Sequence, residues 1–137
     1  PTASEYQKQG KWHILASVGE ASGEIPYTSF ICLESYIKNN SETLEKFINA
    51  LKKGIDFLKT KTELEVANAI VKQFPSTTIE SIETSIKNYK KIDAWKLDLI
   101  PTESSFDRLQ NVMMYSKELH TKLAFNQIVN TSLLKAK

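Results

Sequence analysis

A long amphipathic segment, residues 41–60, limits the folds open to this chain. Ser41 stands where a helix N-cap is expected, and Glu42 and Glu45 fall in the first turn, where negative charge is favourable. Apolar residues then recur every three or four positions, which is typical of a helix with one buried face. These residues are Leu44, Phe47, Ile48, Leu51, Ile55 and Leu58. The pattern predicts one long helix whose apolar face forms the core.

Two short segments before this helix are predicted to be strands. Residues 27–33, which follow Pro26, are rich in β-branched and aromatic side chains, and residues 12–18 have a similar character. Residues 19–26 separate the two segments and contain glycine, serine and proline, so they form the most turn-prone part of the chain. We therefore expect a loop there, or a crossing between two lobes.

The rest of the sequence predicts helices. Residues 2–10 suit a short helix that ends near Gly10. Thr62 with Glu65, and Thr77 with Glu80, have the spacing of a capping box. Thr102 is placed to cap a helix that continues through His120, and a short amphipathic element is expected over residues 125–134. In the predicted core, Leu44, Phe47, Leu51, Ile55 and Leu58 are buried, with Phe30 and Ile31 nearby.

Composition is ordinary for one soluble domain: 137 residues, 41% hydrophobic and 25% charged. The formal net charge of +2 is too small to indicate a nucleic-acid partner. Cys32 is the only cysteine, so no internal disulfide is possible. No apolar run approaches the ~20 residues of a membrane span. Because the chain starts at Pro1 without a signal peptide, we expect a processed piece whose targeting signal lies outside it.

Catalytic and metal-binding patterns are missing from the sequence. His13 and His120 have no cysteine or histidine partners at metal-ligand spacing. The sequence also lacks a nucleophile elbow, a phosphate-binding loop and a dinucleotide fingerprint. We therefore expect neither an enzyme nor a bound metal or cofactor.

Several segments resemble the C-terminal part of the solute-binding proteins that serve ABC importers for nitrate, alkyl sulfonates, taurine and thiamine-pyrimidine precursors. The segments are residues 1–4, 19–27, 35–42, 47–54 and 128–133. One departure is Ser41, where that family often has proline, and both residues suit a helix start. The resemblance covers nearly all of this chain but only the last part of a full-length binding protein.

The resemblance implies an α/β fold of the periplasmic-binding-protein type, with two lobes and a ligand cleft between them. Residues 1–18 would be the tail of one lobe, residues 19–26 a hinge crossing, and residues 27–137 the mostly helical remainder of the other lobe. The implied function is extracytoplasmic capture of a small organic or anionic solute and its delivery to a membrane permease, without bond making or breaking.

Five residues are candidates for function under this resemblance. Ser22, Glu24 and Tyr27 are expected to face the ligand: the Glu24 carboxylate would pair with a cationic group, and the Tyr27 ring would stack on a planar one. Gly19 and Gly23 would act as hinge residues. The alternative is that Glu24 is a solvated loop residue and Tyr27 packs at a strand end.

A second hypothesis is an autonomous helical module that binds a partner protein through an amphipathic face and has no small-molecule ligand. If residues 27–33 form a strand that has lost its neighbours, the isolated chain is also expected to dimerise or to exchange strands. The sequence leaves the identity of the solute open.

Overall fold

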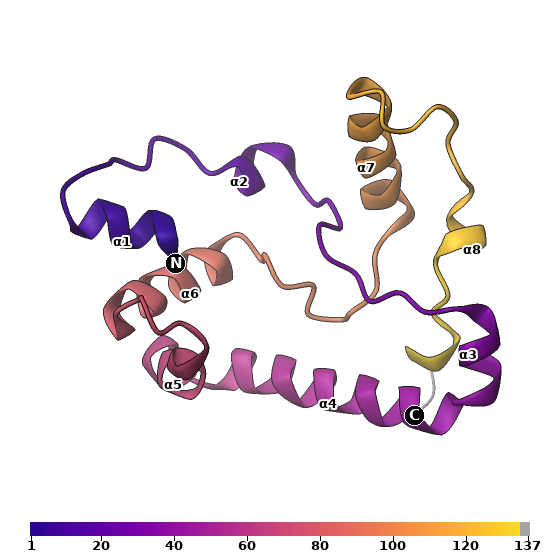
Figure 1. Cartoon of the computed structure of the whole chain (residues 1–137), viewed down its shortest axis with the longest axis horizontal. Coiled ribbons are helices and arrows are strands. Elements are labelled where there is room, and N and C mark those ends of the chain that lie inside the picture. The colour runs from indigo at the N-terminus through magenta and orange to yellow at the C-terminus, as the bar shows by residue number, and fades with distance from the viewer. Residues whose placement is uncertain (135–137) are drawn as a thin grey trace. The chain divides into compact units, whose positions relative to one another are not determined.

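The computed structural model describes residues 1–134, and that part of the chain consists of helices joined by irregular segments (Figure 1). The α-helices are α1 Thr2–Lys8, α2 Val18–Ser22, α3 Glu34–Asn39, α4 Ser41–Thr60, α5 Glu63–Ile70, α6 Ile79–Lys91, α7 Glu103–Tyr115 and α8 Phe125–Ile128. Two short 3₁₀ turns, η1 Val71–Gln73 and η2 Ser132–Leu134, complete the described structure.

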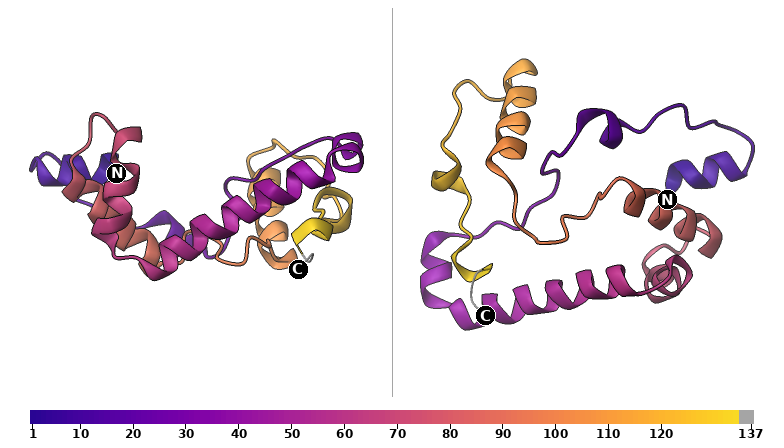
Figure 2. Two further views of the ribbon diagram at one scale, coloured as in Figure 1. Left: turned by 90° about the horizontal axis from the view of Figure 1, so that it is seen from below. Right: turned by 180° about the vertical axis from the view of Figure 1, so that it is seen from behind.

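The predicted α/β fold is wrong for the part of the chain that the structure describes. Residues 12–17 and 25–33 have no regular structure, Val18 begins α2, and neither Figure 1 nor Figure 2 contains a strand. β-branched and aromatic residues favour a strand only where a neighbouring strand pairs with the backbone and other groups cover the faces. Leu15 and Ile31 are 96% and 94% exposed, so their segments lack such cover.

Most helix predictions from capping and periodicity are confirmed. In the capping box of α5, the Glu65 amide donates to Thr62 Oγ1 (3.2 Å) and the Thr62 amide donates to Glu65 Oε2 (2.9 Å). Thr102 caps α7 in the same way, with Ser105 as its partner. The N-cap of α6 is Thr78, one residue later than expected.

Two helix boundaries differ from the predictions. Residues 34–39 form α3, a helix that the sequence analysis did not predict. Helix α7 ends at Tyr115 and not at His120, because Lys117 takes a positive φ of 64°. The amide of Glu118 then donates to the Met113 carbonyl (2.9 Å), which closes the helix end.

The chain divides into two compact units. One unit contains Pro1–Ser22 and Lys53–Leu97, and the other contains Gly23–Lys52 and Asp98–Lys137. Helix α4 contributes residues to both units. The chain first passes between the units at Ser22 and Gly23, inside the segment predicted to be a crossing.

The first unit holds the buried apolar core. Helix α5 packs against α6, and the buried core side chains are Val66, Ala67, Ile82 and Ile86. Partly buried hydrophobic residues pack around them: Leu58, Ile70, Val71, Phe74 and Trp95. Helix α1 lies beside α6 (Figure 1), and the buried hydroxyls of Ser4 and Ser85 are 3.1 Å apart. The core therefore forms around two short helices.

Polar contacts fix α1 to the first turn of α6. Ser81 Oγ donates to Glu5 Oε2 (2.6 Å), and Lys8 forms an ion pair with Glu80. The hydrogen bond from Ser81 lowers the pKa of Glu5, and one from Gln9 acts in the same direction.

The second unit has no buried hydrophobic side chain among its residues up to Leu134, where Ser105 and Gln110 are the buried residues. Aromatic pairs join its segments: Phe30 with Phe47 at 4.8 Å between ring centroids, and Phe106 with Phe125 at 5.7 Å, both edge to face.

The prediction that α4 supplies the core face is mostly wrong. Leu44, Leu51 and Ile55 are only half-buried, and Phe47 is 41% exposed. Of the five predicted core residues, Leu58 is the one that packs against the buried cluster. An amphipathic pattern identifies the apolar face of a helix, but burial also needs a second element to cover that face.

We predict that truncation in the α5–α6 core costs more stability than truncation on α4. Ile82→Ala should lower the free energy of unfolding by about 2–5 kcal/mol, because it leaves a cavity among packed side chains. Leu51→Ala should cost roughly 1 kcal/mol or less, since that side chain keeps solvent contact. Urea unfolding of both variants measures this, and a larger loss for Leu51→Ala would contradict this placement of the core.

We also predict an acid-dependent contribution from the capping box of α5. Hydrogen bonds from the Thr62 amide and hydroxyl, with Lys61 nearby, lower the pKa of Glu65 from 4.5 to about 2. A lowered pKa in the folded state stabilises the fold above pH 4.5, and this contribution is lost as the pH falls toward 2. Urea unfolding across that range should show a shallower pH dependence for Glu65→Gln than for the unmodified chain. Equal slopes would contradict the assignment.

Candidate functional site

The segment predicted to be the crossing, residues 19–26, leaves α2 through a glycine turn. Ser22 is the half-buried last residue of α2, and Gly23 has a φ of +69°. Only glycine adopts this left-handed conformation without strain from a Cβ atom. Glu24 is exposed and Tyr27 is 95% exposed. Whether Ser22, Glu24 and Tyr27 bind a ligand stays a prediction.

Arg108 on α7 holds this segment within the second unit. Its Nη1 donates to the Glu24 carbonyl at 2.8 Å. A Cβ atom added to Gly23 would lie 3.0 Å from the same Nη1, so the guanidinium fills the space that the glycine leaves open. Gly23 therefore meets two requirements at once, a positive φ and a close approach by Arg108.

The other predicted hinge residue lies in a different environment. Gly19 is the second residue of α2, and a Cβ there would approach Ile92 Cδ1 at 3.2 Å. Gly19 and Ser22 belong to the first unit, whereas Gly23, Glu24 and Tyr27 belong to the second. The predicted hinge role of both glycines stays a prediction.

Sequence reasoning missed Arg108, although one signal was present. It is the only arginine among the 137 residues, in a chain that otherwise uses lysine. The planar guanidinium carries five donors and suits fixed contacts better than a lysine ammonium does. Its partner is 84 residues away in the chain, so local patterns do not reveal the contact.

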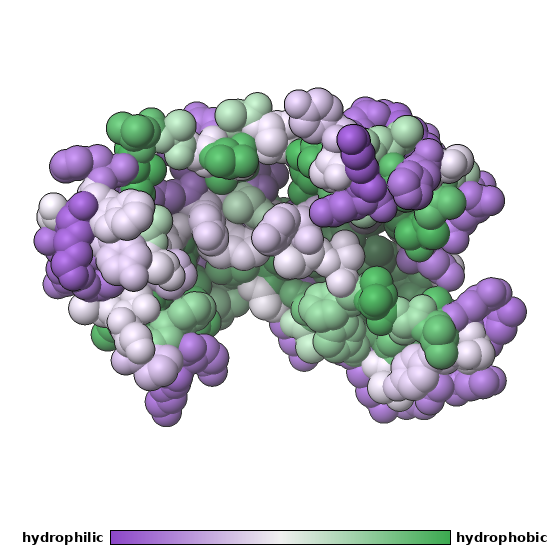
Figure 3. All heavy atoms as spheres, turned by 45° about the horizontal axis from the view of Figure 1, so that its top comes forward, coloured by the Kyte–Doolittle hydropathy of each residue, from purple (hydrophilic) through white to green (hydrophobic). Residues whose placement is uncertain are grey.

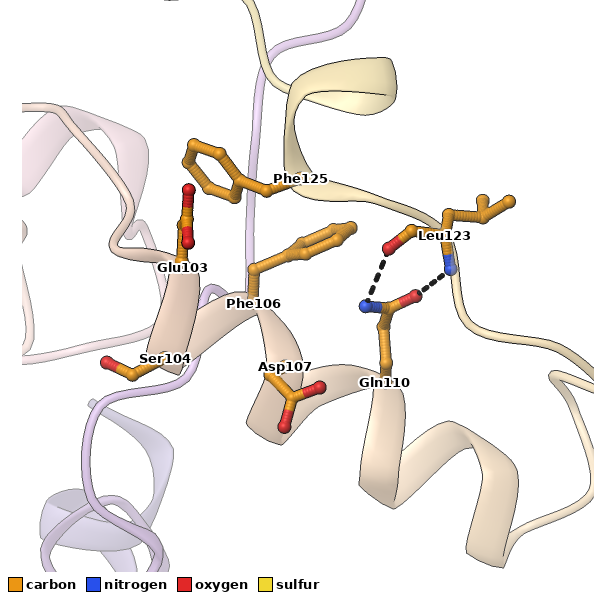
Figure 4. A pocket seen from close by; sticks show the side chains of 7 residues that line it. All are labelled: Glu103, Ser104, Phe106, Asp107, Gln110, Leu123 and Phe125. Carbon is orange, nitrogen blue, oxygen red and sulfur yellow. Dashed lines mark hydrogen bonds between the residues drawn. The ribbon is translucent and has the colours of Figure 1, made fainter.

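A hollow of about 380 Å³ lies beside α7, also within the second unit, and it is shallow and open to solvent (Figure 4). It is lined by Glu103, Ser104, Phe106, Asp107, Gln110, Leu123 and Phe125. The rings of Phe106 and Phe125 meet edge to face at an interplanar angle of 76°. The lining therefore combines an aromatic wall with two carboxylates.

Gln110 fixes the segment that forms the far wall of this hollow. Its Oε1 accepts from the Leu123 amide (2.6 Å), and its Nε2 donates to the Leu123 carbonyl (3.2 Å), as the dashed lines of Figure 4 show. Because Gln110 is 5% exposed, these two bonds satisfy an amide that would otherwise be costly to bury. One feature of the sequence pointed to a role for Gln110: it is a polar residue one helical turn after Phe106, on the same side of α7.

A second contact ties the same segment to α7. Lys122 Nζ lies 2.5 Å from Asp107 Oδ1, and Asn111 Nδ2 donates to Asp107 Oδ2 (3.2 Å). The hydrogen bond from Lys122 lowers the pKa of Asp107 below its ordinary value, and the one from Asn111 acts in the same direction.

The described part of the chain contains neither a metal-binding cluster nor a membrane-spanning helix. No group of three or more histidine, cysteine, aspartate or glutamate side chains among residues 1–134 is arranged to hold a metal ion. None of the helices in the described part of the chain has the length and apolar character needed to cross a membrane.

We predict that Gly23 is more sensitive to substitution than Gly10, which serves as its matched control. Both have a positive φ, 69° and 68°, but a Cβ at Gly10 would meet nothing within 4 Å. Gly10→Ala should cost about 1–2 kcal/mol from backbone strain alone. Gly23→Ala should cost more, because it also displaces Arg108 from the Glu24 carbonyl. Equal losses in urea unfolding would argue against the Arg108 contact.

Comparison with known proteins gives one informative similarity. No family model matches the chain, and no solved structure matches it. The chain is 38% identical over 133 residues, 97% of its length, to a Bacillus subtilis (strain 168) protein named "Putative binding protein YtlA". The chain spans about two fifths, 40%, of that protein's length.

Proposed function

We propose that this chain is the C-terminal part of an extracytoplasmic solute-binding component of an ABC importer. The observation that carries the proposal is the 38% identity over 133 residues to a protein named as a binding protein. The resemblance of residues 19–27, 35–42 and 47–54 to nitrate, sulfonate, taurine and thiamine-precursor binding proteins supplies the transport role. The solute is a small organic or anionic molecule, and the membrane permease is the partner that receives it.

Under this proposal, residues 19–26 carry the motion that accompanies solute binding. Gly23 already occupies a conformation that is strained for residues with a Cβ atom, and Arg108 holds the backbone that follows it. A change in the Gly23–Glu24 backbone has to break or rebuild the Arg108 hydrogen bond. This contact therefore influences the balance between open and closed forms without touching the solute.

A helical interaction module without a small-molecule ligand is the second candidate. The helical character of residues 1–134 favours it, as do the exposed apolar side chains, some of which appear as green patches in Figure 3. Phe30 and Leu33, for example, are 76% and 75% exposed. Self-association of the isolated chain through residues 27–33 stays a prediction. It is expected both for a helical interaction module and for the C-terminal part of a solute-binding protein.

Calorimetry on two proteins separates the two candidates. The first is the 137-residue chain, and the second is the longer protein to which we assign it. Both are titrated with taurine, an alkyl sulfonate, nitrate and a thiamine-precursor pyrimidine. We expect binding to the longer protein alone, because this chain supplies one side of the cleft at most. Failure of every solute to bind the longer protein, or tight binding by the chain alone, would overturn the proposal.

Two variants of the longer protein sharpen this test. Replacing Gly23 by valine should change the affinity for whichever solute binds, because only the closed-competent fraction binds tightly. Replacing Glu24 by Gln should weaken binding only for a cationic or hydrogen-bond-donating solute. Gly10→Val is the matched control, since it introduces the same strain at a position without neighbours.

A further inference from the structure

We propose that the hollow beside α7 binds a small organic cation, specifically an ammonium group attached to an aromatic ring by a short chain. The lining residues of this hollow do not include Ser22, Glu24 or Tyr27, the residues predicted to face the solute. Its volume of about 380 Å³ falls within the range of about 300–1,000 Å³ that is usual for small-molecule pockets.

The aromatic wall provides the first element of recognition. Phe106 and Phe125 are both half-buried, so part of each ring still faces the hollow. Their edge-to-face arrangement leaves ring surface against which a ligand ring can pack. The face of an aromatic ring also attracts a nearby cation.

The charge of the rim provides the second element. Glu103 and Asp107 are four residues apart on α7, so both carboxylates lie on the same side of the helix. Asp107 is neutralised by Lys122 at 2.5 Å. Glu103 has no ion-pair partner among residues Pro1–Leu134, and it is the carboxylate that the cation is proposed to contact. Figure 4 shows Glu103 and Phe125 among the side chains that line the hollow, which suits a ligand carrying both a cation and an aromatic group.

The hydrogen bonds of the far wall provide the third element. Gln110 holds Leu123 through two bonds, and the Asp107–Lys122 pair holds the preceding residue. Phe125 lies two residues after Leu123 and its ring packs on Phe106, so this ring is positioned before a ligand arrives. A preorganised wall reduces the entropy lost on binding. Because the hollow is shallow, we expect a dissociation constant on the order of 1 mM for a single-ring amine.

Two probes with the same ring and linker and with opposite charge test the proposal. 2-Phenylethylammonium and 3-phenylpropionate share the ring and a two-carbon chain, and differ in the charged group. Titration of the ¹⁵N-labelled 137-residue chain, followed by amide chemical shifts, locates binding and gives its affinity. The ammonium should shift residues 103–107, 110 and 123–125 in a saturable and salt-sensitive way. The carboxylate should bind at least about tenfold more weakly, because it meets Glu103.

Matched variants separate the site from nonspecific attraction. Glu103→Gln should weaken binding of the ammonium about two- to fivefold, as expected for an exposed charge contact. Glu42→Gln, which alters the corresponding first turn of α4, should leave the affinity unchanged. Phe125→Leu should weaken binding by a similar two- to fivefold through the lost ring. If the amide spectrum of Phe125→Leu shows that this variant is unfolded, the comparison of Glu103→Gln with Glu42→Gln alone decides the test.

Three results would overturn the proposal. One is the absence of saturable shifts with the ammonium up to about ten times the expected dissociation constant. Another is equal or tighter binding of 3-phenylpropionate. The third is an equal effect of Glu103→Gln and Glu42→Gln. Because the test uses the 137-residue chain and probes outside the importer solutes, its outcome is independent of the proposed transport function.

Discussion

The packing of α5 against α6 is the interaction on which this structure depends most. It provides the four buried hydrophobic side chains of the described chain, Val66, Ala67, Ile82 and Ile86, and it gives α1, Phe74 and Trp95 a surface to pack against. The two capped helix starts place these short helices, because Thr62 and Thr78 fix where each one begins. Local capping and one apolar contact thus organise the whole first unit.

The second unit is held together differently. Single side chains there connect distant segments: Arg108 to the Glu24 carbonyl, Gln110 to Leu123, and Lys122 to Asp107. These contacts are specific in geometry, yet each contributes modestly to stability where water competes for the same groups. The hollow beside α7 and the predicted site residues Gly23 and Glu24 lie among these contacts, in the unit with the least apolar burial.

Sequence reasoning succeeded where the deciding interactions were local. The caps at Thr62 and Thr102 and the extent of α4 follow from residues within one or two turns of each other. Residues 27–33 were assigned as a strand from side-chain preference, but a strand also requires a pairing partner. The apolar face of α4 was predicted correctly, but the sequence did not show which elements would pack against that face. Arg108 was missed because its partner is 84 residues away, and the hollow because its walls meet through contacts 13 and 15 residues apart, beyond the reach of helix periodicity.

Helix α4 has a consequence for local opening, because its residues up to Lys52 belong to one unit and those from Lys53 onward to the other. Its C-terminal turns include Leu58, which packs on the buried cluster, whereas its N-terminal turns carry the exposed ring of Phe47. The hydrogen bonds along one continuous helix therefore have unequal protection. Amide hydrogen exchange should be slow near Leu58 and become progressively faster toward Ser41, so that α4 frays from its N-terminus without disturbing the core.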